Sequence, residues 1–369
     1  MVLSAQTTRS EIEDKIRNNE TLSAEDITYL YDVADINWLG GLSREIADSI
    51  SGNRVSFVSN LILNYTNICN VRCKFCAFYR TGNEDDAYTM TEDQVVQEIA
   101  KYYDAFDIRQ LLIQGGVNPS LPPEYYFSLF SRIRKEFPKI GIHGLSTSEI
   151  SFISKKAKLS VRDLLIELRK SGLETIPGAG AEIFDSDVRK KLGRPVNSGK
   201  EWLSIMEEAH KLGIRTSSTM MFGHVETSKD KADHLLSILE LQKKYHGFLS
   251  FTPWNFEPGN TQLEREGLVL QRTGGLDVVR NIAVARLVFR SDLPVIQSSW
   301  LTNGISMGQL AIMYGANDWG GTIYDEKVIP ATGKQVGNLR KEIIISAVKQ
   351  LGMIPVERDN LYRTVKIYD

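Results

Sequence analysis

Short apolar runs rich in β-branched residues alternate with amphipathic helical segments through most of this chain, from Val55 onward. This alternation predicts parallel strands joined by helical crossovers, because parallel strands need a long connection between them. Eight such runs fit eight β/α units, so we expect an α/β fold of the (β/α)8 TIM-type barrel class. The predicted strands begin near Val55, Ile108, Ile140, Leu173, Ile214, Phe248, Val295 and Ala311, and the predicted helices span residues 91–105, 123–136, 160–171, 199–212, 228–245 and 274–290, with a short one near 306.

An open, doubly wound parallel sheet would show the same local pattern. The barrel is favoured because eight units are present and no G-x-G-x-x-G fingerprint follows the first strand. The length of 369 residues suits an elaborated barrel. We therefore predict an N-terminal helical extension over residues 1–54, the barrel over 55–337, and a C-terminal helix (339–351) and tail packed on the barrel over 338–369.

Polar and glycine residues follow the predicted strands at the points where the strands end. In a barrel these ends meet at one mouth, where the βα loops form the active site. We expect one functional site there. The groups, in strand order, are Asn67 with the cysteines, 114–116, His143 with Ser146, 178–182, 220–226, 253–257, Gln297, Ser298 and Trp300, and finally Asn317 with Asp318.

All three cysteines of the chain, Cys69, Cys73 and Cys76, follow the first strand in the spacing C-x3-C-x2-C. Three thiolates on one loop cannot all pair as disulfides, and thiolate sulfur is a natural ligand of iron. No fourth cysteine exists, so one iron of a cubane cluster would stay open to a small molecule. Structural zinc would need a fourth ligand, and the histidine closest in sequence is the remote His143. We favour an iron-sulfur cluster over zinc and over buried free thiols.

This spacing, with Phe75 just before the last cysteine, resembles the signature of the radical S-adenosylmethionine (SAM) superfamily. The resemblance implies that the three cysteines hold a [4Fe-4S] cluster and that SAM chelates the open iron. Reductive cleavage of SAM would give a 5'-deoxyadenosyl radical that abstracts hydrogen from a small-molecule substrate. An electron donor such as flavodoxin or ferredoxin is implied as well.

The resemblance also suggests how SAM would be bound near the cluster. Phe75 is one expected cofactor contact, and Gly115-Gly116 resembles the glycine-rich motif whose exposed backbone binds the methionine amino group. That motif often ends in glutamate, whereas Val117 follows here, so only backbone roles carry over. The alternative for the two glycines is a plain tight turn.

Two further SAM contacts are expected after the fourth strand. Glu182 is placed where related barrels hold the ribose hydroxyls with a carboxylate, which accepts both hydroxyl hydrogens. A basic residue near the next helix, Lys200 or else Arg189, would pair with the SAM carboxylate. The alternatives are a solvated loop glutamate and plain surface charges.

Three residues at the expected mouth are candidates for proton transfer: His143, His224 and Glu226. Histidine titrates near working pH, and a partly buried carboxylate can act as a base. A histidine at a strand end is otherwise often a satisfied hydrogen-bonding residue. Three aromatic residues would stack on a substrate ring or simply pack the mouth: Trp254, Phe256 and Trp300.

Similarity to one group within the superfamily extends from about Val55 to Gly333. The group holds menaquinone enzymes of the futalosine pathway and deazaflavin-chromophore synthases. Within it, Cys76-Ala-Phe-Tyr-Arg80 and Phe251-Thr-Pro-Trp-Asn-Phe256 are most similar to cyclic dehypoxanthinylfutalosine synthases. The other shared segments are 114–119, 142–146, 177–182, 219–226 and 315–322.

The reaction implied by this resemblance is an intramolecular ring closure of dehypoxanthine futalosine. The radical would take hydrogen from ribose C4', the carbon radical would add to the arene, and loss of an electron and a proton would restore aromaticity. His143 or Glu226 would be the base. The alternatives are aminofutalosine synthase or deazaflavin-chromophore synthase of the same group and, in a different class, a non-catalytic iron-sulfur or zinc-binding protein.

Composition limits the partners and the compartment. Apolar content of 42% and charged content of 24% are those of a globular protein, and a net charge of −2 gives no overall attraction to nucleic acid. No apolar run reaches the length of a membrane span, and no secretory signal opens the chain. We expect a reducing cytoplasm, which also suits an exposed cluster.

Overall fold

The computed structural model describes residues 8–193, 198–269, 272–337 and 339–369. A six-stranded parallel sheet lies at its centre, and its strands are adjacent in the order in which they occur along the chain. They are β2 (Asn60–Leu63), β3 (Gln110–Ile113), β4 (Gly141–Gly144), β5 (Leu173–Ile176), β6 (Arg215–Phe222) and β7 (Phe248–Asn255). A second sheet has the order β10 (Thr364–Ile367), β9 (Ile354–Arg358), β1 (Arg54–Val58) and β8 (Asp318–Gly321).

The two sheets join into a barrel through single parallel bridges. Phe251 of β7 bridges to Ile296, and the next residue, Gln297, bridges to Asp318 of β8. β8 pairs with β1, which runs on into β2, and Leu61 of β2 bridges to Tyr324 after β8. The closed barrel therefore has eight strand positions, if β1 and β2 are counted as one strand and residues 296–297 as another. The predicted TIM-type barrel is confirmed.

Most helices begin and end close to the predicted residues. α4 (Glu92–Tyr103), α5 (Pro123–Glu136), α7 (Val161–Ser171), α9 (Gly199–Lys211), α10 (Ser228–Tyr245), α12 (Gly275–Phe289) and α14 (Ile305–Met313) correspond to the seven predicted barrel helices. Short additional elements were not predicted, namely α6 (Thr147–Ala157), α8 (Ser186–Lys191), α11 (Gln262–Arg265), α13 (Trp300–Asn303) and the 3-10 helix η1 (Pro330–Thr332).

The predicted strand near Ala311 is wrong. Ala311 is buried in helix α14, and the eighth strand is β8, with the sequence Asp-Trp-Gly-Gly. Glycine and aspartate are poor strand formers, so β8 carries little local signal and exists because it pairs with β1. Asn317 and Asp318 consequently lie where β8 begins, not at the mouth where it ends. The seventh strand, predicted near Val295, consists only of the isolated β-bridges at Ile296 and Gln297.

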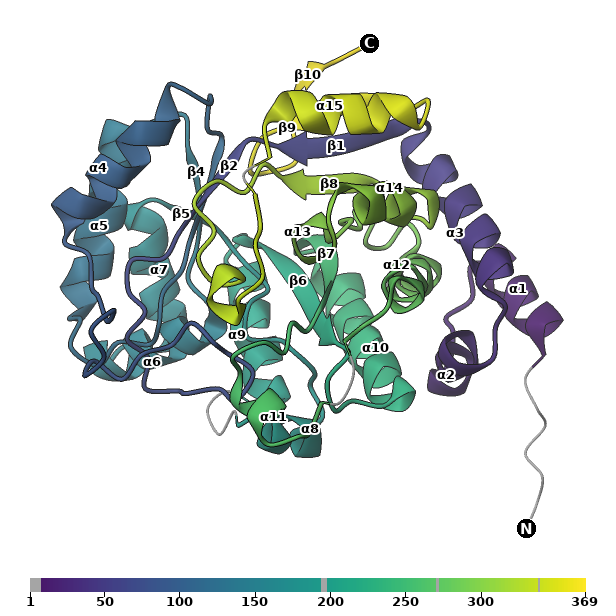
Figure 1. The fold of residues 1–369 in the computed structure, drawn as a ribbon, viewed down its shortest axis with the longest axis horizontal. Coiled ribbons are helices and arrows are strands. Elements are labelled where there is room, and N and C mark those ends of the chain that lie inside the picture. Colours follow the sequence, from purple (N-terminus) through teal and green to yellow (C-terminus); the bar gives the residue numbers. More distant parts are fainter. Residues whose placement is uncertain (1–7, 194–197, 270–271, 338) are drawn as a thin grey trace.

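The predicted N-terminal helical cap is confirmed as α1 (Arg9–Arg17), α2 (Ala24–Asp32) and α3 (Ile36–Ser51). It packs beside α10 and α12 of the barrel, on one side of the molecule (Figure 1). Arg280 of α12 donates to the carbonyl oxygens of Leu30 and Ala34, and Arg290 donates to that of Ile16. These arginines connect the barrel to main-chain carbonyl groups where α1 and α2 end.

The C-terminal segment is more than a helix with a tail. α15 (Lys341–Gln350) packs near β9, and β9 extends the sheet by pairing in parallel with β1 (Figure 1). The division at 54/55 and 337/338 stays a prediction, and residue 338 lies outside the described residues. No described helix is both long and apolar enough to span a membrane.

Candidate active site

The cysteine loop leaves the end of β2 and lies against the residues that follow β3. Cys73 is buried, and Cys69 and Cys76 are half-buried and pack on the same small apolar cluster, which contains Val71 and Val117. The main-chain N–H of Asn70 donates to the carbonyl oxygen of Val117. Among the described residues, no three His, Cys, Asp or Glu side chains lie close enough together to hold a single metal ion. A cubane does not require this, because each cysteine binds a separate iron.

Arg80 organises this loop from within. Its guanidinium donates to the carbonyl oxygens of Ala77 and Tyr79 at 3.1 and 3.0 Å and forms an ion pair with Asp86. In the main chain, Cys69 N donates to Arg80 O at 2.9 Å and Arg80 N donates to Asn67 O at 2.7 Å. The segment Cys76-Ala-Phe-Tyr-Arg80 thus closes back on the loop that carries the cysteines.

Gly116 allows the loop after β3 to approach the cysteine loop. A Cβ at position 116 would lie 2.2 Å from the carbonyl oxygen of Ile68 and 2.9 Å from Cys69 Cβ. The Gly116 N–H donates to the carbonyl oxygen of Thr66. No side chain fits there without moving backbone, so the glycine is required by this close contact.

We therefore expect Gly116→Ala to displace the cysteine loop. The added methyl group meets a backbone oxygen, and overpacking of this kind costs about 1–3 kcal/mol. The variant should retain less iron and sulfide per chain than the wild type after anaerobic reconstitution, measured by chemical assay. Gly41→Ala is the matched control, because a Cβ at Gly41 in α3 meets nothing within 4 Å. Equal iron retention in both variants would contradict the assigned contact.

Glu149 is a site residue that sequence reasoning missed. Its side chain is buried, accepts from Gly115 N at 3.0 Å and from the hydroxyl of Tyr65, and also caps α6 through Ser146. Burial raises the pKa of Glu149. The pattern Ser146-x-x-Glu149, a capping box, was the available signal. The carboxyl group of Glu149 therefore fixes the Gly115-Gly116 loop to the first turn of α6.

The fourth predicted strand is β5, and the SAM contacts expected after it, Glu182 and either Lys200 or Arg189, do follow β5 in the chain. Glu182 is buried and adopts a left-handed backbone conformation (φ 42°), and its carbonyl oxygen accepts from Met221 N of β6. Arg189 is buried and donates to the carbonyl oxygens of 180, 181 and 183, which holds that turn. Lys200 is exposed in the first turn of α9.

His224 and Glu226 hold the turn that follows β6. Glu226 accepts from the main-chain N–H of Gly223 and of His224, at 2.7 and 2.9 Å. His224 Nε2 lies 3.0 Å from Met221 O, and Val225 N lies 2.7 Å from His224 Nδ1. Burial lowers the pKa of His224. Both residues, with Lys231, line a cavity of about 500 Å³ between β6, α10 and α12.

His143 faces the inside of the barrel. It is half-buried, and the strand register places it between Leu112 of β3 and Thr175 of β5. Its Nδ1 lies 2.7 Å from Thr175 Oγ1, and its Nε2 lies 3.4 Å from Ser217 Oγ. Burial, with Arg358 nearby, lowers the pKa of His143 to about 3. The imidazole is therefore neutral.

Strand β7 adds residues to the same inner face. Thr252 and Trp254 are half-buried, whereas Phe251, Pro253 and Asn255 beside them are buried. This alternation is that of a strand with one face toward an open interior. Of the three aromatic candidates, only Trp254 is partly accessible, because Phe256 and Trp300 are buried.

Comparison with known proteins agrees with this geometry. Residues 63–238 match the model of the radical SAM superfamily. The chain belongs to the radical SAM superfamily. Residues 245–369 match a second model, the CofH/MqnC C-terminal region. Methylornithine synthase has the same fold, with a TM-score of 0.71 at 19% identity over 93% of this chain and 97% of that chain.

Three curated relatives of this radical SAM protein carry different names. One is a 5-amino-6-(D-ribitylamino)uracil–L-tyrosine 4-hydroxyphenyl transferase of Methanopyrus kandleri, 38% identical over 86% of each chain. Another is an aminodeoxyfutalosine synthase of Thermus thermophilus, 36% identical over 97% of this chain and 96% of the relative. A third is a cyclic dehypoxanthine futalosine synthase of Halalkalibacterium halodurans, 31% identical over 95% and 94%. The protein is thus a member of the radical SAM enzyme family.

The cofactors of the superfamily, a [4Fe-4S] cluster and SAM, are the cofactors of this protein. The residues present fit them, since three thiols share one loop and Gly116 lets the loop after β3 approach those thiols closely. Cys69, Cys73 and Cys76 would hold the cluster. The individual roles predicted for Phe75, Gly115, Gly116, Glu182 and Lys200 toward SAM stay predictions.

Proposed function

We propose that this radical SAM enzyme is a cyclic dehypoxanthine futalosine synthase. When bound, the cofactors would supply a 5'-deoxyadenosyl radical that takes one hydrogen from ribose C4' of dehypoxanthine futalosine. The C4' radical of the substrate would then bond to its own arene, and the ring-closed radical would give one proton to a base and return one electron to the oxidised cluster, which the electron donor reduced at the start. The product has two hydrogens fewer than the substrate, and SAM leaves as methionine and 5'-deoxyadenosine.

The observation that carries the proposal is the position of the two segments most similar to such enzymes. Cys76-Ala-Phe-Tyr-Arg80 closes the cluster loop through the Arg80 hydrogen bonds, and Phe251-Thr-Pro-Trp-Asn-Phe256 turns Thr252 and Trp254 into the barrel. An indole on the inner face offers a flat surface on which an arene can stack. A neutral His143 on the same face offers a hydrogen bond.

Of the residues predicted to transfer protons, we propose that His143 contacts the substrate. His224 and Glu226 would act first on the turn after β6, because the main chain satisfies both of their side chains. A base role for Glu226 or His224 stays a prediction. Flavodoxin or ferredoxin as the electron donor and a cytoplasmic location also stay predictions.

The test is anaerobic turnover of the iron-reconstituted protein with dithionite, SAM and dehypoxanthine futalosine, read by mass spectrometry. We expect 5'-deoxyadenosine together with a product two hydrogens lighter than the substrate. Cleavage of SAM without that product would contradict the substrate assignment.

Two sister activities are the competing outcomes, since relatives with those names are 36% and 38% identical to this chain. An aminofutalosine synthase would attach the adenosyl group of SAM to an enolpyruvyl ether, so 5'-deoxyadenosine would not be released. A transferase would join a fragment of L-tyrosine to 5-amino-6-(D-ribitylamino)uracil. Parallel assays with each substrate set separate the three activities.

A further inference from the structure

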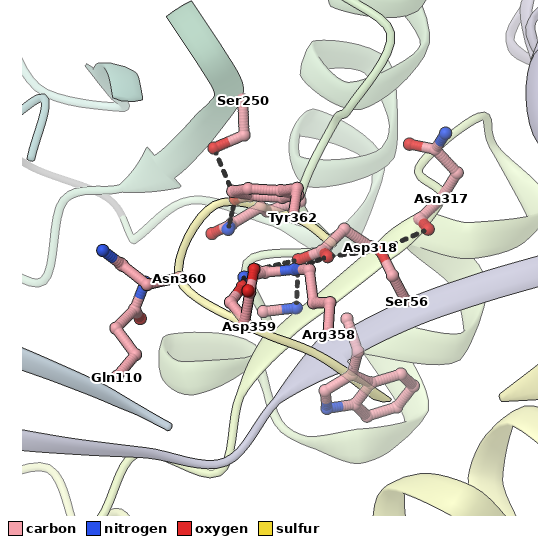
Figure 2. A network of polar contacts seen from close by, with 12 residues as sticks. Ser56, Gln110, Ser250, Asn317, Asp318, Arg358, Asp359, Asn360 and Tyr362 are labelled. Atoms are coloured by element: carbon pink, nitrogen blue, oxygen red, sulfur yellow. Dashed lines mark hydrogen bonds and ion pairs between the residues drawn. The ribbon is translucent and has the colours of Figure 1, made fainter. Parts of the chain in front are cut away.

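The segment Arg358–Tyr362, which follows β9, reaches the barrel interior at the end where the strands begin. Arg358 pairs with Asp318 at the start of β8, and the hydroxyl of Tyr362 donates to Ser250 Oγ of β7 at 2.7 Å (Figure 2). Asn360 lies beside Gln110, the first residue of β3 (Figure 2). The C-terminal segment therefore forms the floor of the barrel interior.

The side-chain amide of Asn360 has one possible orientation. Its Nδ2 lies 2.6 Å from Glu174 Oε2, and its Oδ1 accepts from Gln110 Nε2 at 2.7 Å. A carboxylate can only accept, so the NH2 group must face Glu174. Gly141 provides the space, because a Cβ there would lie 2.4 Å from Asn360 Cβ.

This orientation limits where the hydroxyl hydrogen of Thr175 can go. Asn360 Nδ2 donates its second hydrogen to Thr175 Oγ1 at 2.9 Å, so the Thr175 hydroxyl has two acceptors within reach, Asn360 Oδ1 at 3.2 Å and His143 Nδ1 at 2.7 Å. The shorter contact favours donation to His143 Nδ1, since Asn360 Oδ1 also accepts from Gln110. Nδ1 is an acceptor, so the single hydrogen of the neutral ring is on Nε2.

The Nε2–H of His143 is held only loosely by the protein. Its contact is with Ser217 Oγ at 3.4 Å, a long distance for a hydrogen bond, and that oxygen already accepts from Gly178 N at 3.0 Å. His143 is also only half-buried, so part of the residue is accessible. A bound molecule with a carbonyl or hydroxyl oxygen could accept this hydrogen bond at normal length.

We propose that Asn360 is a positioning residue that, through Thr175, holds His143 as the Nε2–H tautomer, so that His143 donates a hydrogen bond to an oxygen of the substrate. The donor role rests on the proposed function, whereas the tautomer is a property of the resting protein. A base role for His143 at Nε2 would require the opposite tautomer. The two roles are therefore distinguishable by observing the ring nitrogens.

The first measurement is the tautomer of His143 in the reconstituted full chain. The protein is labelled with ¹⁵N-histidine, and long-range ¹H–¹⁵N correlation spectra identify the protonated nitrogen of each ring. His143→Gln assigns the signals among the 5 histidines. We expect a neutral ring with hydrogen on Nε2. A resting protein with hydrogen on Nδ1 overturns the proposal.

The second measurement removes or reverses the hydrogen-bond chain. Thr175→Val removes the hydroxyl with little change in shape and should release the tautomer preference, whereas Thr175→Ser keeps the hydroxyl and should keep the tautomer. The double change Asn360→Asp and Glu174→Gln exchanges amide and carboxylate without bringing two carboxylates together. The Thr175 hydroxyl would then donate to residue 360, and hydrogen should move to His143 Nδ1. An unchanged tautomer in both Thr175→Val and the double variant overturns the positioning role.

The third measurement tests the donor role by turnover of dehypoxanthine futalosine. The variants that change the tautomer should lose about tenfold in kcat/KM, the size of one hydrogen bond, and Thr175→Ser should match the wild type. Full turnover in a variant whose tautomer has changed overturns the donor role. Absence of turnover in the wild type, with the expected tautomer, contradicts the proposed function and with it the donor role, but leaves the assignment of the tautomer to Asn360 supported.

Discussion

Replacing Cys73 with serine is expected to abolish SAM cleavage. Cys73 is the buried member of the three cysteines, and no fourth cysteine in the chain can replace it. Without a complete cluster the radical cannot be generated, and turnover should fall by about 10⁶-fold or more, the lower range of enzymatic rate enhancement. The measurements are iron and sulfide per chain after reconstitution, and 5'-deoxyadenosine released with dithionite and SAM.

The control for this variant is Asn70→Ala, since the side chain of Asn70 is exposed on the same loop. This control should load iron and cleave SAM as the wild type does, because Asn70 bonds to Val117 through its main-chain N–H, which the substitution keeps. Iron retention and SAM cleavage in Cys73→Ser at the level of the control would show that Cys73 is not a ligand.

The parts of the fold that sequence predicted are those encoded locally. Helix α10 begins at Ser228, directly after the N-cap Thr227 that forms a capping box with Asp230, and it keeps its apolar spacing to Tyr245, so both of its ends were predicted. The three cysteines could be interpreted for the same reason, because their spacing on one loop already limits the chemistry.

The parts that sequence did not predict depend on long-range pairing. β8 contains two glycines and forms against β1, and β9 forms against the other side of β1. Neither pairing leaves a periodic signal in the sequence. Asn360 contacts Thr175, which is 185 positions away along the chain, so no local pattern could associate it with His143.

The roles of site residues were harder to predict than their positions. His224 and Glu226 do lie at the end of β6, as expected, but the nearby main-chain groups accept or donate most of their hydrogen bonds. Phe256 and Trp300 are buried, which agrees with the packing alternative predicted for them and not with stacking on a substrate ring. Which polar atoms remain free for a ligand depends on the packing of neighbouring elements, and residue type alone does not determine it.

The ion pair between Asp318 and Arg358 should be the most sensitive point for stability among the pairs of the barrel floor. Arg358 Nε lies 2.6 Å from Asp318 Oδ2 and Nη2 lies 3.0 Å from Oδ1, and the two side chains are 2% and 0% exposed. Ser56 Oγ and Gly320 N also donate to this carboxylate. Asp318→Ala would leave a buried guanidinium without its partner, which costs about 3–5 kcal/mol.

The measurement is chemical unfolding of the reconstituted protein under anaerobic conditions, with Lys190→Ala as the control. Lys190 pairs with Asp187, both side chains are about three-quarters exposed, and an exposed pair contributes at most about 1 kcal/mol. Asp318→Asn is the informative companion variant, because it keeps the shape of the side chain and one acceptor oxygen, for either Ser56 or Gly320, but removes the charge. If charge burial is the cause, Asp318→Asn should resemble Asp318→Ala; stability close to the wild type would instead assign the effect to the hydrogen bonds. A loss in Asp318→Ala no larger than in Lys190→Ala would show that the C-terminal segment is held on the barrel floor by its other contacts.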